Sequence, residues 1–152
     1  MGSSRRSFIG DVALGKVLVE AKITNLFDTY LLNAGSIRPE QVRSISVPKA
    51  RMDLGITTLT LPTSMIEQLG LVKKGSKRVR TASGVTDINL YDAVYLLVQG
   101  RKCTVDVMEL LEGSPVLIGQ IPLELFDFVI DMRGQRLIGN PDHGGEQILD
   151  LL

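Results

Sequence analysis

Glycine and proline break the chain into short stretches in which apolar and polar residues alternate. Residues 17–23 and 42–47 have a period of two, which is typical of strands with one buried face. Helical spacing occurs in only two brief stretches, residues 62–70 and 121–128. Fifteen glycines among 152 residues supply tight turns between the strands. The sequence therefore predicts an all-β fold, a small barrel or a sandwich, with one or two short helices.

The clearest predicted hairpin lies in the middle of the chain. Residues 73–80 form a strongly basic run, and a second alternating stretch begins after residues 81–84. A charge run without aromatic residues is more often an exposed strand than a nucleic-acid site. We therefore expect a β-hairpin with a small-residue tip at residues 81–84. Strand pairs are also expected at residues 93–110 and 129–139, a short strand at 116–119, a turn or excursion at 25–40, and a strand end at Pro48.

Length and charge limit the kinds of protein that this chain can be. At 152 residues and 16.6 kDa it has the size of one domain. We expect a flexible N-terminal arm at residues 1–9, the folded domain at residues 10–141 and a C-terminal tail at residues 142–152. Seventeen basic and 17 acidic residues balance, so no nucleic-acid partner is expected. No apolar run reaches the length of a membrane span, so no membrane partner is expected.

The N-terminus contains a short match to an export signal. Arg5 and Arg6, followed by an apolar stretch, resemble the start of a twin-arginine signal. Asp11 and Lys16 interrupt that stretch, and no small-residue cleavage site follows it. We therefore expect a cytoplasmic protein, with export as the alternative.

Cysteine and histidine offer little chemistry in this chain. Cys103 is the only cysteine and His143 the only histidine, and they lie far apart in the sequence. This excludes an internal disulfide and leaves no thiolate or imidazole cluster for zinc, so no metal and no cofactor are expected. We expect Cys103 to be a small buried apolar residue and His143 to be exposed and without function. Any hydrolytic chemistry must then come from carboxylates or hydroxyls.

A carboxylate is found where such chemistry could occur, between two strand-like segments. Residues 50–62 read ARMDLGITTLTLP, in which Asp53 precedes Gly55 by two positions. An acidic residue followed so closely by glycine, between β-prone stretches, predicts a carboxylate held in a tight turn.

Beyond this turn, the order of the segments resembles that of the retropepsin-like aspartic proteases, the single-domain proteases of retroviral type. An Asp-x-Gly turn alone is a weak sign, because many turns contain one. The ordered series is more specific and covers residues 25–141. Its parts are NLFD at residues 25–28, the turn and TLTLP at 53–62, MIEQLGL at 65–71, TASG at 81–84, VLIG at 116–119 and VIDMRGQRLIGNP at 129–141.

The resemblance implies a small closed acid-protease barrel with a flap hairpin, which contributes one aspartate to a homodimer. Two carboxylates that lie close together share one proton, so that one activates a water and the other protonates the peptide. It also implies a polypeptide substrate. The residues concerned are Asp53 as the catalytic group, Leu54, Gly55 and Ile56 in the catalytic loop, Ala82, Ser83 and Gly84 in the flap, and Leu117, Ile118 and Gly119 packed behind the site.

Two positions depart from the family pattern. The family has Thr or Ser after the aspartate and Ala after the glycine, whereas this chain has Leu54 and Ile56. The hydroxyl braces the two catalytic loops across the dimer, and leucine has no donor with which to do so. Three hypotheses follow: an aspartic endopeptidase of reduced activity, a catalytically silent dimerisation or peptide-binding module, and an unrelated β barrel in which Asp53 only caps a turn.

Overall fold

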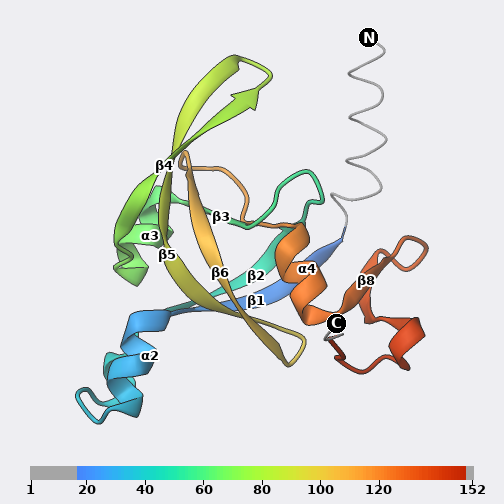
Figure 1. Cartoon of the computed structure of the whole chain (residues 1–152), viewed down its shortest axis with the longest axis horizontal. Coiled ribbons are helices and arrows are strands. Elements are labelled where there is room, and N and C mark those ends of the chain that lie inside the picture. Colours follow the sequence, from blue (N-terminus) through green and yellow to red (C-terminus); the bar gives the residue numbers. More distant parts are fainter. Residues whose placement is uncertain (1–16, 150–152) are drawn as a thin grey trace.

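The computed structural model describes residues 17–149, which form a mostly β structure with three short α-helices (Figure 1). The β prediction is confirmed, but the sequence indicated only one or two helices. The expected N-terminal arm and the Arg5-Arg6 pair lie outside the described residues. The strands are β1 (Leu18–Asn25), β2 (Ser44–Met52), β3 (Leu59–Pro62), β4 (Lys73–Thr81), β5 (Gly84–Val98), β6 (Arg101–Leu110), β7 (Leu117–Ile118), β8 (Phe128–Asp131) and β9 (Arg136–Gly139). The helices are α2 (Leu26–Asn33), α3 (Thr63–Leu69) and α4 (Gln120–Phe126).

Six strands of the described chain close into a ring. Their order is β1-β2-β7-β3-β6-β5, and β5 pairs back onto β1, where Ile23 faces Leu96. β4 pairs with β5 outside this ring. The short strand β7 is parallel to β2 and antiparallel to β3. The predicted closed barrel is therefore a ring-like sheet with mixed pairing, in which a two-residue strand joins its two halves.

One apolar core joins the sheet and the helices. Alternate residues of β1, including Val19, Ala21 and Ile23, are buried, which confirms the predicted period of two. Met52 and Ile118 are completely buried at the ends of β2 and β7, so the chain enters both of the following loops from fixed positions. The largest fully buried side chains are Phe126, Ile23, Met52, Leu59, Leu61, Leu69, Leu96 and Ile118.

Strand β2 does not end at Pro48, as the sequence suggested, but continues to Met52. The pairing with β1 places Ala21 opposite Val47 and Val19 opposite Ala50, so the register shifts between these pairs. Pro48 lies within this bulge. A proline has no N–H to donate to the neighbouring strand, and a bulge is where a sheet tolerates it. The chain can therefore cross the proline and carry the strand on to the Asp53 turn.

Helix α2 occupies the region that was predicted as a turn or excursion. The Asn25 side chain accepts a hydrogen bond from the Asp28 amide at 2.9 Å, which caps the helix. Asp28 is buried and accepts two hydrogen bonds from the Arg43 guanidinium, at 2.8 and 2.9 Å. These bonds hold the pKa of the Asp28 carboxyl below its usual value. The helix is thus fixed by a residue 15 positions away, which a local pattern does not reveal.

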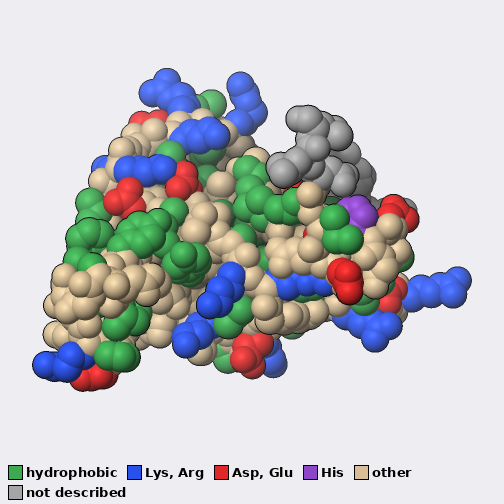
Figure 2. All heavy atoms as spheres, turned by 60° about the horizontal axis from the view of Figure 1, so that its bottom comes forward, with side chains coloured by type: hydrophobic (Ala, Val, Ile, Leu, Met, Phe, Trp, Pro, Cys, Tyr) green, Lys and Arg blue, Asp and Glu red, His purple; other side chains and the backbone are tan. Residues whose placement is uncertain are grey.

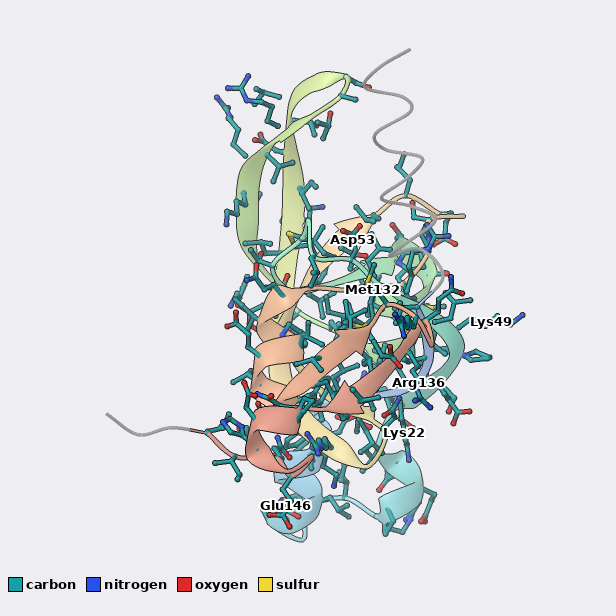
Figure 3. The ribbon with its side chains drawn as sticks, turned by 90° about the vertical axis from the view of Figure 1, so that its right-hand side faces the viewer. Lys22, Lys49, Asp53, Met132, Arg136 and Glu146 are labelled. Carbon is teal, nitrogen blue, oxygen red and sulfur yellow. The ribbon has the colours of Figure 1, made fainter. Side chains whose placement is uncertain are left out.

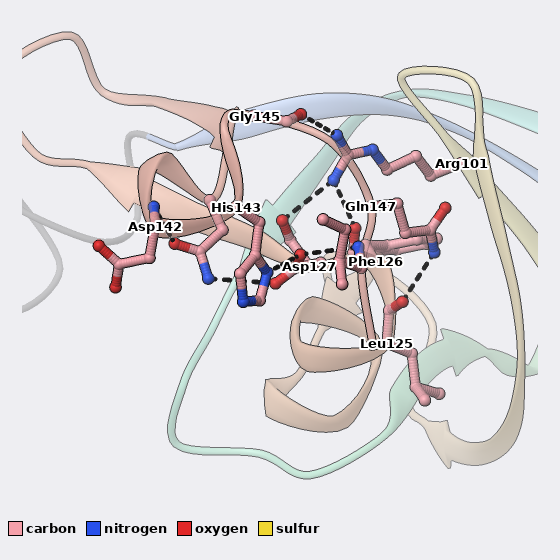
Figure 4. Close-up of polar contacts among 10 residues, drawn as sticks. Arg101, Leu125, Phe126, Asp127, Asp142, His143, Gly145 and Gln147 are labelled. Atoms are coloured by element: carbon pink, nitrogen blue, oxygen red, sulfur yellow. Dashed lines mark hydrogen bonds and ion pairs between the residues drawn. The ribbon is translucent and has the colours of Figure 1, made fainter. Parts of the chain in front are cut away.

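The segment after β9 packs against the C-terminal end of α4 (Figure 4). Asp127 contacts His143 Nδ1 through one carboxylate oxygen, and the same oxygen accepts a hydrogen bond from the Ile148 amide at 3.0 Å. The Gln147 side chain donates to the carbonyl oxygen of Leu125 at 2.8 Å. The prediction that His143 is exposed is therefore wrong, because its side chain is only 24% exposed and contacts Asp127.

Candidate active site

Asp53 lies immediately after β2, at the start of a loop that is hydrogen-bonded to strand β7. Its amide donates a hydrogen bond to the carbonyl oxygen of Ile118 at 2.9 Å, which extends the parallel pairing of the two strands by one residue. The amide of Gly55 donates to the Asp53 carboxylate at 2.8 Å. A Cβ at position 55 would lie 3.0 Å from that same carboxylate oxygen, so glycine permits the close approach. The predicted carboxylate in a tight turn is present.

The loop that follows, residues 53–58, is bound to the start of helix α4. The amides of Gly119, Gln120 and Ile121 donate hydrogen bonds of 2.7–3.0 Å to three successive loop carbonyls, those at positions 58, 56 and 57. The first amides of a helix have no partner within the helix, so they are free to bind these oxygens. The backbone of the loop is therefore fixed from both of its ends and along its length.

Gly119 is the point of closest contact between the loop and the chain behind it. A Cβ at this position would lie 2.6 Å from the carbonyl oxygens of Ile56 and Thr58. No side chain fits there without moving the loop. Ile118 and Gly119 thus contact the loop directly, whereas Leu117 pairs with Arg51 and Thr60 in the strands on either side of it.

The two residues that depart from the family pattern have different surroundings. Leu54 is 41% exposed at the outer side of the loop, whereas Ile56 is half-buried. The Ile56 amide approaches the carbonyl oxygen of Asp53 at 3.4 Å and closes the turn. Every bond described for this loop joins backbone to backbone, apart from the one accepted by the Asp53 carboxylate. The loop therefore keeps its shape without a hydroxyl at position 54.

The predicted hairpin is formed by β4 and β5, with Ala82 and Ser83 at its tip. The Thr81 hydroxyl accepts a hydrogen bond from the Ser83 amide and donates one to the carbonyl oxygen of Gly84 at 3.0 Å. Gly84 has φ of +117°, a backbone conformation that favours glycine. Figure 3 shows Asp53 in the half of the molecule from which the hairpin extends.

A second carboxylate near the hairpin was not found by sequence reasoning. Glu109 accepts hydrogen bonds from Thr63 at 2.7 Å and Asn89 at 2.9 Å, with the Tyr91 hydroxyl at 3.3 Å. These bonds hold the pKa of Glu109 below its ordinary value, although burial opposes the shift. The carboxylate borders a hollow of about 350 Å³ that Thr81 of the hairpin also lines. Its partners come from two other elements, α3 and β5, so nothing local marks the residue.

The single cysteine, Cys103, is buried. Burial raises the pKa of the Cys103 thiol to about 12, so it is not a nucleophile in the folded protein. Residues 17–149 contain no group of three or more histidine, cysteine and acidic side chains placed to hold a metal. Within the same residues, no helix is long and apolar enough to cross a membrane.

Comparisons with known proteins find likenesses among solved structures. No protein-family model matches the chain, and no curated protein matches it. Among solved structures, the chain is similar to the protease of simian foamy virus (mac), determined in solution. The two are 20% identical, the match covers 70% of this chain and 93% of that one, and the TM-score is 0.44.

Proposed function

We propose that this protein is a homodimeric aspartic endopeptidase of reduced activity, which hydrolyses peptide bonds with a water activated by two Asp53 carboxylates. The observation that carries the proposal is the Asp53 loop. Its carboxylate accepts a hydrogen bond from Gly55, and its backbone is bound to β7 and to the first amides of α4. A catalytic group needs such fixed support, because small displacements of a reacting group lower the rate strongly.

The reaction requires a second copy of the chain, because the loop supplies one carboxylate. Two carboxylates about 3 Å apart do not both ionise, so they share one proton. The ionised Asp53 takes a proton from the bridging water, and the water attacks the peptide carbonyl. The protonated Asp53 of the other chain donates its proton to the carbonyl oxygen, which gives a tetrahedral diol. The first Asp53, now protonated, then donates its proton to the peptide nitrogen as the C–N bond breaks, and the other Asp53 takes a proton from a diol hydroxyl, so that the pair again holds one proton. The β4–β5 hairpin covers the substrate and excludes water.

Leu54 is the reason to expect slow turnover. A hydroxyl at this position would donate one hydrogen bond per chain, worth about 0.5–1.5 kcal/mol. Loss of that bond leaves the two loops less firmly oriented toward each other. The same residue supports a second candidate function, a catalytically silent module that dimerises or binds peptides. The intact loop favours the enzyme, because its anchoring bonds do not depend on the residue at position 54.

The direct test is proteolysis of an unfolded polypeptide between mildly acidic and neutral pH. Wild-type protein should cleave it, and a statin-type transition-state mimic should block the cleavage. Asp53→Asn should abolish activity, while Asp142→Asn, at an exposed aspartate of the C-terminal segment, should leave it unchanged. Cleavage that persists in Asp53→Asn would rule out the aspartic mechanism.

A second variant separates the enzyme from the silent module. If the wild-type chain shows no turnover, Leu54→Thr restores the missing hydroxyl, and recovered activity would identify a decayed protease. Continued silence together with retained peptide binding would support the module. Both functions need a dimer, so a chain that remains monomeric with bound peptide would contradict both.

A further inference from the structure

We propose that a hollow between helix α2 and the outer face of the sheet binds a phosphate monoester through Lys22 and Lys102. The hollow has a volume of about 390 Å³, and both lysines line it. Lys22 lies at the end of the molecule that carries α2, away from Asp53 (Figure 3). Figure 2, in which this end comes forward, shows basic side chains on the face beside α2. The inference goes beyond the proposed function and does not depend on proteolytic activity.

The pairing of three strands places the two lysines in one row. Lys22 of β1 is opposite Leu97 of β5, and Leu97 is opposite Lys102 of β6. Residues opposite each other point to the same face of a sheet, and the neighbours of these three along each strand are buried in the core. Both lysines are therefore on the outer face, with Cα atoms two strand spacings, about 10 Å, apart. Because lysine has a flexible four-carbon stem, both ammonium groups can reach one anion above Leu97.

Neutral hydrogen-bond donors line the same hollow. Thr24 and Tyr95 form the next row of the sheet, and Asn33 lines the hollow from α2. Within residues 17–149, these three side chains form no hydrogen bond, so their donors are free to bind a ligand. Thr29, one turn before Asn33, donates its hydroxyl hydrogen to the carbonyl oxygen of Asn25 at 3.0 Å. The helix side of the hollow is thus fixed to the end of β1.

The acidic side chains of the surrounding elements lie elsewhere. Asp28 of α2 is buried and bound to Arg43, and Asp106 of β6 pairs with Lys74 at 2.6 Å. Asp92 of β5 lines a different hollow. Among the described residues, no acidic side chain lines the hollow, and neither of its two lysines has an ion-pair partner. Two positive charges therefore face one space without a negative charge to balance them, which favours an anion there.

The types of donor favour a phosphate group over a carboxylate. Planar carboxylates are best bound by the two-pronged guanidinium of arginine, whereas lysine binds phosphate as a point charge. Two ammonium groups also match the charge of a phosphate monoester, which is close to two at neutral pH. The hollow has the size of a small-molecule site, and Leu97 and the ring of Tyr95 provide apolar surface for the organic part of the ligand.

The test is an NMR titration of the whole chain with phenyl phosphate, inorganic phosphate and benzoate. Phenyl phosphate should shift the amide signals of Thr24, Thr29 and Tyr95 and saturate with a dissociation constant of about 1 mM or less. Inorganic phosphate, which lacks the ring, and benzoate, which carries one charge, should bind more weakly. The same spectra show that each variant below is folded.

Two lysine variants and a matched control locate the site. Lys22→Gln and Lys102→Gln should each raise the dissociation constant for phenyl phosphate by about threefold or more, and the double variant should raise it further. Lys49→Gln removes the same charge from an exposed position of β2 outside the hollow, and should change the constant by less than about 1.5-fold.

Four results would overturn the inference. The first is the lack of saturable shifts in wild-type protein up to about 10 mM phenyl phosphate. The second is unchanged binding in Lys22→Gln and Lys102→Gln. Equal weakening by Lys49→Gln would show attraction by overall charge rather than a site. Benzoate binding as tight as that of phenyl phosphate would contradict the assignment to phosphate. Because the titration measures binding alone, a chain without proteolysis that binds phenyl phosphate in this way would support the inference and leave the proposed enzyme contradicted.

Discussion

The amide of Gly119 donates a 2.7 Å hydrogen bond to the carbonyl oxygen of Thr58, and this contact joins the aspartate loop to the segment behind it. Gly119 follows the buried Ile118, which itself binds the Asp53 amide. Two adjacent residues therefore fix both ends of a loop that lies more than 60 positions earlier in the chain. The position of the candidate catalytic carboxylate depends on this long-range contact.

Replacement of Gly119 by alanine should destabilise the protein by about 1–3 kcal/mol, because the new Cβ would meet two carbonyl oxygens at 2.6 Å. Urea unfolding measures this change. Gly75→Ala is the matched control: nothing lies within 4 Å of a Cβ there, and we expect little change. Equal stability of the two variants would contradict the close packing behind the loop.

The Asp28–Arg43 pair should stabilise helix α2 and its attachment to the sheet. Asp28→Asn should lower the free energy of unfolding by about 1–3 kcal/mol, because a buried carboxylate that accepts three hydrogen bonds from Arg43 is lost. The exposed Arg38–Glu40 pair provides the comparison, and Glu40→Gln should change stability by less than about 1 kcal/mol. Denaturant titration of both variants tests the difference.

Asp127 should make stability depend on pH in the acidic range. The contact with His143, followed by the Ile148 amide, lowers the pKa of Asp127 to about 2. A carboxyl with a lowered folded-state pKa stabilises the protein above its unfolded pKa, and this contribution is lost as the pH falls through the folded value. Asp127→Asn should therefore show a shallower loss of stability than wild type between about pH 4 and pH 2.

Unfolding curves at several pH values measure this effect, with Asp142→Asn as a control in the same segment. Hydrogen exchange gives an independent check, because Asp127→Ala removes the acceptor of the Ile148 amide and should speed its exchange. If Asp127→Asn keeps the wild-type pH profile and Asp127→Ala leaves the exchange of the Ile148 amide unchanged, the packing of the segment after β9 against α4 is contradicted.

Cys103 should not react in the folded protein. Its pKa of about 12 keeps the side chain as a thiol at pH 8, and burial restricts access to it. A chromogenic disulfide reagent should detect no thiol in native protein and one per chain after unfolding in urea. Rapid labelling of the native protein would show that β6 opens near Cys103.

Local sequence patterns correctly predicted the elements that are formed by contacts between residues close together in the chain. The alternation in β5 and β6 and the Gln99-Gly100 turn predicted a hairpin, and the spacing in α3 with Gly70 after it predicted that helix. Helix α2 was missed because Phe27 and Tyr30 are exposed, so no apolar face marks it. Glu109 and His143 were missed for a related reason: their partners come from distant segments.

The sequence by itself determined the period of the strands, the hairpin turns at residues 81–84 and 99–100 and the presence of one carboxylate in a tight turn, because each depends on a few consecutive residues. Only the tertiary structure decided that β7 lies between β2 and β3, that β5 closes the ring on β1, and that Asp53 is supported from behind. These features depend on hydrogen bonds and packing between residues far apart in the chain. The conformational preferences of neighbouring residues do not specify such pairings.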